Sequence, residues 1–159
     1  MSILVLGLGN ALMNDDAVGV RAIEELRLRF AFSAEVQLVD GGTLGLDLLP
    51  FLEGVERLLI IDAIDMGGAP GDLFRLEGDE VPRAFASKLS VHQMGVQDLL
   101  AVAELQGHVP RELVVHGVQP ASIEMEMQLS PAVTTAMEPL LAGIVAELER
   151  WGVRRQQAA

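Results

Sequence analysis

Acidic side chains and one histidine occupy positions along this chain where they could do chemistry together. The acids fall into three groups, each after an apolar segment: Asp15 and Asp16, then Asp40, then Asp62 and Asp65. The histidine is His92, at the start of a helical segment. Two carboxylates and an imidazole form an oxygen/oxygen/nitrogen ligand set, which suits a borderline divalent ion such as nickel or zinc. The residue types therefore predict a metal site drawn from these groups.

The segment around His92 favours a neutral, metal-binding imidazole. Ser90 and Gln93 have the Ser-x-x-Gln spacing of a capping box, which predicts a helix that begins at Ser90. His92 then lies in the first turn, near the positive end of the helix dipole. That position disfavours the imidazolium form and keeps a nitrogen lone pair available.

Each candidate also has a simpler structural interpretation. Asp15 and Asp16 could only cap a helix, and Asp62 could end a strand and bind a loop amide. His116 lies inside an apolar segment and is interpreted as a core histidine with a satisfied hydrogen bond. His108 is expected in an exposed loop. The convergence of the other groups on one edge of a sheet is what favours a functional site.

The alternation of predicted strands and helices along the chain locates that edge of the sheet. Continuous apolar runs predict strands buried on both faces at residues 3–8, 35–39, 57–62 and 112–118. Amphipathic helices are predicted between them, at 18–30, after Ser90, and from the Ser130-Pro131 start to Trp151, with Pro139 as a kink or the true start. This pattern predicts an α/β fold, a three-layer sandwich with a mostly parallel twisted sheet and helices on both faces. Such sheets bind ligands at the carboxyl ends of their strands.

The remaining segments are expected to be irregular. Residues 40–43 (Asp-Gly-Gly-Thr) are predicted as a loop, 44–49 as a short helix stopped near Pro50, and 77–88 as a loop. The chain is expected to form a single domain over residues 1–159, with 151–159 as a frayed tail.

Composition excludes several classes of protein. Eleven basic and 23 acidic residues give a net charge of −12, which argues against nucleic acid and anionic membranes as partners. No apolar run reaches the roughly 18–20 residues of a membrane span. The chain has no cysteine, which removes disulfides, thiolate metal sites and cysteine nucleophiles. The first residues show no basic stretch before their apolar run, so we expect no signal peptide and a cytoplasmic protein. Nothing in the dispersed charge suggests more than a monomer.

Several catalytic motifs are also missing from the sequence. There is no G-x-S-x-G elbow, no H-E-x-x-H helix and no P-loop. The Gly7-Leu-Gly9 turn departs from the dinucleotide fingerprint, because Leu12 stands where the third glycine should be. These glycines are interpreted as a tight turn, and no nucleotide cofactor is expected.

The ordered set of motifs resembles the [NiFe]-hydrogenase maturation endopeptidases. The similar blocks cover nearly the whole chain, and they are residues 3–10 (ILVLGLGN), 15–21 (DDAVGVR), 40–45 (DGGTLG), 61–65 (IDAID), 90–93 (SVHQ) and 117–120 (GVQP). Each block alone is weak, but the set in this order is specific.

The resemblance implies a protease that removes a C-terminal extension from the hydrogenase large-subunit precursor after nickel insertion. Nickel would be supplied by the substrate rather than permanently bound. The family's metal-contacting positions fall on Asp16, Asp62 and His92. At the first of these positions the family carries Glu or Asp, and this chain carries Asp. Asp40, in the Asp-Gly-Gly-Thr block, is also implicated in catalysis with an uncertain role.

Three questions stay open on sequence alone. The nickel ion could activate the carbonyl or the water, or it could only position the chain while a carboxylate such as Asp40 acts as base. A nonenzymatic nickel-binding or chaperone module could use the same residues. A peptidyl-tRNA hydrolase-like enzyme would share the Gly-Leu-Gly-Asn start, but the acidic charge and the residues after Asn10 disfavour it.

Overall fold

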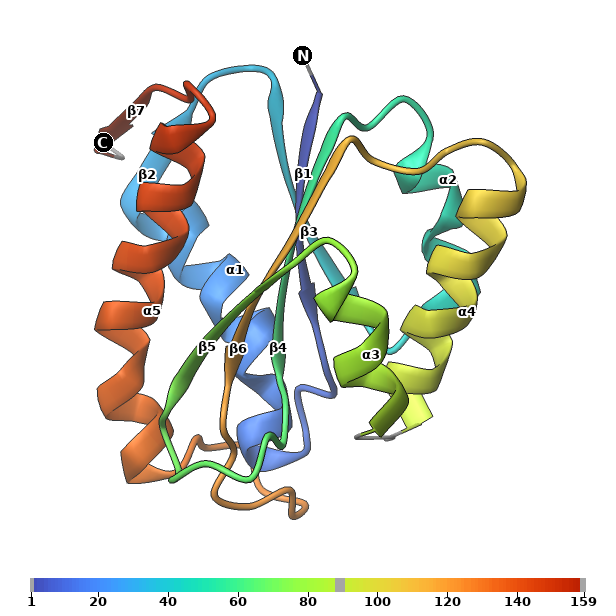
Figure 1. Ribbon diagram of the computed structural model, residues 1–159. Coiled ribbons are helices and arrows are strands. Elements are labelled where there is room, and N and C mark those ends of the chain that lie inside the picture. Colours follow the sequence, from blue (N-terminus) through green and yellow to red (C-terminus); the bar gives the residue numbers. More distant parts are fainter. Residues whose placement is uncertain (1, 88–90, 158–159) are drawn as a thin grey trace.

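A mostly parallel sheet forms the centre of the protein (Figure 1). The computed structural model describes residues 2–87 and 91–157, without the side chains of 85–87 and 91–96. Within that part, five strands pair in the order β3-β1-β4-β6-β5. The parallel members are β1 (Ile3–Leu8), β3 (Val36–Gly42), β4 (Arg57–Ala63) and β6 (Glu112–Val118), and the antiparallel edge strand is β5 (Leu73–Glu77). A separate pair joins β2 (Phe30–Phe32) to β7 (Arg155–Gln157).

Helices cover both faces of the sheet, as Figure 1 shows. One face carries α1 (Val18–Arg29) and α5 (Pro131–Arg150). The other carries α2 (Leu49–Leu52), α3 (Glu80–Ser87) and α4 (Val91–Leu105). Two short 3-10 helices precede helices, η1 (Asn14–Ala17) before α1 and η2 (Gly45–Leu48) before α2. The predicted α/β sandwich is confirmed. No helix within the described ranges has both the length and the apolar character to cross a membrane.

The two faces of each central strand build two separate cores. All six residues of β1 are buried, and their side chains alternate between the faces. Ile3 and Val5 pack in the cluster that includes α1 and α5. Leu4 and Leu6 pack in the cluster that includes Leu48, in η2, and residues of α4. This two-sided burial explains why the strand reads as a continuous apolar run.

Glycines let α1 lie unusually close to the sheet. A Cβ atom built on Gly19 would lie 2.2 Å from the carbonyl oxygen of Ile61 and 2.5 Å from that of Leu8. A Cβ atom on Gly7 would lie 2.3 Å from the carbonyl oxygen of Gly19. The start of α1 therefore rests directly on the backbone of β1 and β4, and only glycine fits at these positions.

Several predicted boundaries are wrong. Residues 80–87 form α3 instead of a loop, because Val81 and Ala84 bury one face of a helix too short to show a clear period. Pro50 lies in the first turn of α2 instead of ending a helix, a position where the missing N–H costs nothing. Residues 40–42, expected in a loop, extend β3 through its pairing with β1.

The segments that follow the two long helices also differ from prediction. Phe30 leaves α1 and begins β2. The segment after Trp151 is ordered over its described residues rather than frayed, because Val153 is buried and β7 pairs with β2. The Arg155 guanidinium lies over the Phe30 ring, 5.1 Å from its centre. By contrast, α5 begins at Pro131 as predicted, with Ser130 as its cap, and it continues through Pro139.

A buried carboxylate fastens α5 to the edge of the sheet. Oε1 of Glu147 lies 2.6 Å from Nε of Arg75, on β5, and 3.1 Å from Nε2 of His116, on β6. Arg150 donates to the other oxygen at 2.8 Å. Burial raises the pKa of Glu147, but these hydrogen bonds outweigh burial and hold the pKa at about 2. Burial also lowers the pKa of His116, and Glu147 offsets this only in part. The contact with Glu147 is the satisfied hydrogen bond that the sequence predicted for His116.

Gly19→Ala should destabilise the protein by about 3 kcal/mol, because a methyl group there forces α1 off two strand carbonyls. Gly143→Ala is the matched control within a helix. Its new Cβ would meet only the His116 ring at an ordinary 3.4 Å, so stability should stay equal or rise by up to about 1 kcal/mol. Urea-induced unfolding followed by circular dichroism measures both. Equal stability of the two variants would contradict the close-packing argument.

Glu147→Gln should cost about 3 kcal/mol at pH 7, since the shift of this buried carboxyl below its ordinary pKa is worth that much to the folded state. A lowered pKa stabilises the fold above the ordinary pKa, and this stabilisation is lost as the pH falls towards about 2. The difference in the free energy of unfolding between the variant and the parent protein should therefore be large at pH 7 and much smaller at pH 3. A gap that does not change with pH would show that packing, not charge, dominates.

Candidate active site

The carboxyl ends of the parallel strands meet at one edge of the sheet, the lower edge in Figure 1. The structure brings three of the predicted residues to this edge. Asp16 lies in η1, which follows β1, while Asp40 and Asp62 lie near the carboxyl ends of β3 and β4. Because β1 pairs with both β3 and β4, the three carboxylates come from neighbouring positions in the sheet.

Asp16 is held by the turn that leaves β1. Its carboxylate is buried, and Oδ2 accepts a hydrogen bond from the Asn10 N–H at 2.9 Å. The Asn10 side chain in turn accepts from the Leu12 N–H at 2.9 Å, which closes the tight turn that the sequence predicted. Gly9 has φ +122°, and a Cβ atom there would lie 1.8 Å from the Asp16 carbonyl oxygen. The turn therefore requires glycine and fixes where Asp16 sits.

Asp62 is fully buried at the end of β4. It lies opposite Gly117 of β6, and η1 packs against β4. The element that carries Asp16 thus contacts the strand that carries Asp62. A fully buried acid at the end of an apolar strand is costly unless hydrogen bonds or a cation compensate it.

Asp40 differs from these two residues because it is exposed. Its Oδ1 accepts a hydrogen bond from the Gly42 N–H at 3.0 Å, and the Gly42 carbonyl accepts from the Gly9 N–H at 2.9 Å. Asp40 is therefore anchored beside the Gly9 turn and open to solvent. This placement suits a group that exchanges a proton with water or substrate.

The position of His92 is settled only at the level of the backbone. His92 lies in the first turn of α4, as predicted, and α4 begins at the same lower end of the sheet (Figure 1). Its side chain lies outside the described residues, so its role as a ligand stays a prediction. Among the described side chains, no three His, Asp or Glu residues form a metal-ligand cluster. The predicted three-residue site depends on His92 for its third ligand.

The structure assigns Asp15 a role that the sequence did not predict. The Asp15 side chain makes no helix-capping hydrogen bond. Instead its fully buried carboxylate accepts hydrogen bonds from the N–H groups of Ala121 (2.8 Å), Ser122 (3.2 Å) and Ser130 (2.7 Å), and from the Ser130 hydroxyl (2.8 Å). Asp15 therefore fixes the segment between β6 and α5.

Gln119 has a similar function at the loop that follows β4. Its Oε1 accepts from the N–H groups of Met66 (2.8 Å) and Gly68 (3.0 Å), and its Nε2 donates to Asp65 at 3.0 Å. The amide thereby fixes the loop that follows β4, in which Asp65 lies. The motif at residues 117–120 marked Gln119 in the sequence, but only the structure shows its partners.

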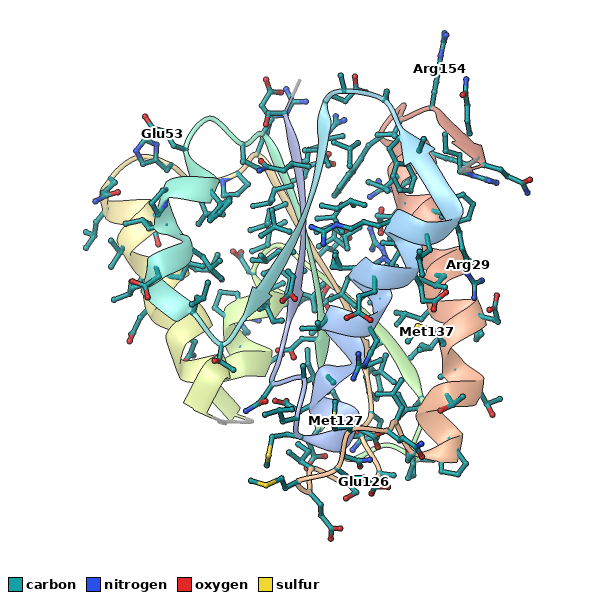
Figure 2. The ribbon with its side chains drawn as sticks, turned by 180° about the vertical axis from the view of Figure 1, so that it is seen from behind. Arg29, Glu53, Glu126, Met127, Met137 and Arg154 are labelled. Atoms are coloured by element: carbon teal, nitrogen blue, oxygen red, sulfur yellow. The ribbon has the colours of Figure 1, made fainter. Side chains whose placement is uncertain are left out.

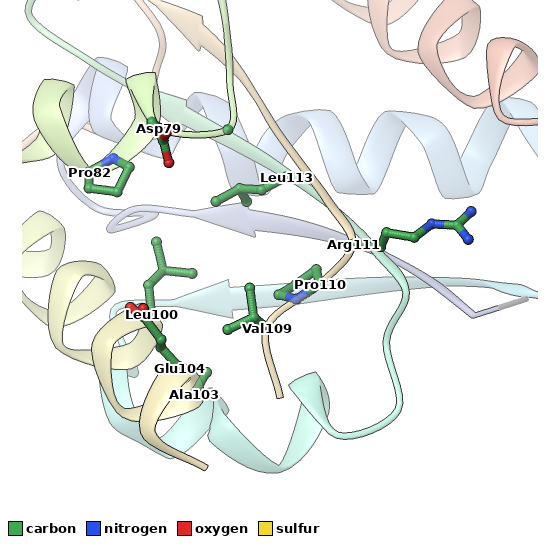
Figure 3. A pocket seen from close by; sticks show the side chains of 10 residues that line it. Asp79, Pro82, Leu100, Ala103, Glu104, Val109, Pro110, Arg111 and Leu113 are labelled. Carbon is green, nitrogen blue, oxygen red and sulfur yellow. The ribbon is translucent and has the colours of Figure 1, made fainter. Parts of the chain in front are cut away.

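A cavity of about 310 Å³ lies at the opposite end of the sheet (Figure 3). Leu100 and Ala103 of α4 line it together with Val109 and with Leu113 at the start of β6. Because Leu113 begins the strand whose other end faces Asp62, this cavity is separate from the carboxylate edge. The acids at the carboxyl edge of the sheet, rather than this cavity, form the candidate active site.

Comparison with known proteins gives consistent results. The sequence pattern of the HycI family, described as hydrogenase maturation protease, matches residues 20–147. The chain is 41% identical over 154 residues to the Hydrogenase 2 maturation protease of Escherichia coli K12, covering 96% of this chain and 94% of that protein. It is 43% identical over 159 residues to the hydrogenase expression/formation protein HupD of Rhodobacter capsulatus, covering 99% and 76%.

Solved structures extend the similarity to the fold. The hydrogenase maturating endopeptidase HybD of E. coli matches with a TM-score of 0.95 and 40% identity, over 99% of this chain and 98% of that one. HybD of Thermococcus kodakarensis, a [NiFe] hydrogenase maturation protease, matches with a TM-score of 0.76 and 29% identity, over 93% and 99%.

These findings define an endopeptidase built on a mostly parallel sheet. Within that class, the chain belongs to the hydrogenase maturation protease family, because the family pattern and the relatives both cover most of its length. The resemblance seen in the sequence motifs is confirmed. The peptidyl-tRNA hydrolase alternative is not supported.

Asp15→Ala should destabilise the protein by about 3 kcal/mol, because it leaves the N–H groups of Ala121, Ser122 and Ser130 without their acceptor. Asp47→Ala, at an exposed acid in η2, is the control and should change stability by less than about 0.5 kcal/mol. Urea unfolding checks both variants. A loss below about 1 kcal/mol for Asp15→Ala would contradict its structural role.

Proposed function

We propose that this protease removes a C-terminal extension from a [NiFe]-hydrogenase large-subunit precursor once nickel has been inserted. The names of its relatives support a hydrogenase precursor as substrate. The observation that carries the proposal is the placement of two buried acids: Asp16 lies in η1, which follows β1 and packs against β4, and Asp62 lies near the carboxyl end of β4. The cytoplasm and a monomeric state remain predictions.

The nickel ion would arrive as part of the substrate. Asp16 and Asp62 would supply oxygen ligands and His92 a nitrogen ligand, a set that suits a borderline divalent cation. Two acids buried at neighbouring strand ends repel each other when both are ionised, and a cation offsets that repulsion. The acids thus favour a precursor that carries the metal over one that lacks it.

Peptide hydrolysis also needs a group to move protons. A water molecule would attack the scissile carbonyl carbon, and a carboxylate would take its proton and return it to the leaving nitrogen. Asp40 suits this task because it is exposed and anchored beside the Gly9 turn. With no cysteine and no G-x-S-x-G motif in the chain, we favour direct attack by water over an acyl-enzyme intermediate.

Intact-mass spectrometry of the precursor tests the function directly. The precursor is mixed with the protein once nickel-loaded and once nickel-free. Loss of a C-terminal peptide only from the loaded form is expected. Cleavage of both forms would keep the protease but reject nickel sensing by Asp16, Asp62 and His92. Cleavage of neither form, with tight nickel binding by the protein alone, would instead support a metal-handling module.

Asp16→Asn, Asp62→Asn and His92→Ala should each slow processing by about 100-fold or more, because each removes a metal ligand. The Asn variants keep the size of the side chain and an oxygen acceptor, so the unfolding midpoint should change little. Asp98→Asn, at an exposed acid on α4, should process at the parental rate. Initial rates from the mass assay measure all four. Full processing by one of the first three would remove that residue from the site.

A further inference from the structure

Apolar side chains are exposed on the segment that borders the active site. Every residue from 123 to 128 is exposed, and this stretch includes Ile123, Met125 and Met127. Met125 is 85% exposed and Met127 66%. Figure 2 shows Glu126 and Met127 at the end of the molecule where α1 begins. Large apolar side chains gathered on an exposed surface indicate an interaction site.

The backbone of this segment is fixed although its side chains are exposed. The Glu126 carbonyl accepts from the Asn14 N–H at 2.7 Å, and Met13 and Glu126 form a parallel β-bridge. The Asn14 side chain donates to the Gln128 carbonyl, and Nη2 of Arg21 donates to the Met127 carbonyl at 3.2 Å. A pre-ordered surface loses less conformational entropy when it binds a partner.

These ties connect the segment to the active site itself. Met13 and Asn14 come just before Asp16 in the chain, and Asp15 anchors the segment at Ala121, Ser122 and Ser130. The exposed Leu12 belongs to the same turn. We define the docking rim as residue 12 together with residues 123–127. A partner bound to this rim therefore lies beside Asp16.

Charge indicates the chemistry of the partner. Glu124 and Glu126 alternate with the apolar residues of the docking rim and are exposed with them. The chain as a whole carries a net charge of −12, so a second copy would bring like charges to this surface. An apolar polypeptide segment with basic residues complements the rim in both respects.

We propose that the docking rim binds an apolar, basic segment of the polypeptide substrate and brings the scissile bond to Asp16. This inference rests on the proposed function, since it takes the hydrogenase precursor as the partner. Methionine suits such a surface, because its unbranched, polarisable side chain adapts to different apolar partners. Glu124 and Glu126 contribute by pairing with basic groups, which makes binding depend on salt.

Binding and cleavage measured together test the docking rim. Biolayer interferometry gives Kd for the nickel-loaded precursor, and the mass assay gives kcat and KM. The double variant Met125→Ser/Met127→Ser should raise Kd and KM by about tenfold and leave kcat unchanged. The matched control is Leu28→Ser/Leu105→Ser, whose side chains are 71% and 87% exposed on α1 and α4. It should change none of these values.

Glu124→Gln/Glu126→Gln tests the charge argument. Kd of the parent protein should rise as salt increases from 0.05 to 0.5 M, on the order of several-fold, and this dependence should weaken in the variant. Circular dichroism melts of all variants should match the parent protein, because the substituted side chains are exposed.

The outcomes separate this proposal from the proposed function. Weaker precursor binding by the serine variant without any cleavage by the parent protein would support the rim and overturn the protease function. Cleavage by the parent protein with unchanged Kd and KM in the serine variant would overturn the rim and keep the protease. The loss of a dimer in the serine variant, seen by analytical ultracentrifugation with precursor binding unchanged, would assign the rim to a second copy and also overturn the proposal.

Discussion

The direct contact of α1 with the backbone of β1 and β4 is the constraint on which the site depends. Gly7 and Gly19 have no side chains to hold the helix away from the sheet, so the Gly19 backbone rests on the carbonyls of Leu8 and Ile61. The chain then has only the short turn after Gly9 in which to pass from strand to helix. Asp15 and Asp16 lie in η1, between that turn and α1, and the close contact of α1 with the sheet limits where η1 can lie.

The adjacent acids Asp15 and Asp16 have different roles because they contact different partners. The Asp15 carboxylate accepts hydrogen bonds from the N–H groups of Ala121, Ser122 and Ser130. Its removal would leave those donors unpaired. Asp16 faces the Gly9 turn and lies in the element that packs on β4. One of these neighbours is thus a structural anchor and the other a candidate ligand. The exposed segment 123–127 is held beside the site by the same 3-10 helix, η1, through Asn14.

Other interactions hold the remaining elements against the sheet. Glu147 ties α5 to β5 and β6 through Arg75 and His116, and its low pKa keeps it ionised at any physiological pH. The pairing of β7 with β2 fixes the end of the chain next to α1. None of these residues belongs to the candidate active site. The Glu147 cluster and the proposed chemistry therefore rest on different charged groups.

The sequence alone determined the fold class, the edge of the sheet and the family, because continuous apolar runs, helix caps and ordered motifs are local signals. It identified Asp16, Asp40 and Asp62 at strand ends, and the structure places all three at one edge. Only the tertiary structure separated Asp15 from Asp16, paired His116 with Glu147, and ordered residues 155–157 against β2. Those outcomes depend on partners that lie between 31 and 127 positions away in the chain, and no local pattern encodes which N–H group a buried carboxylate will meet.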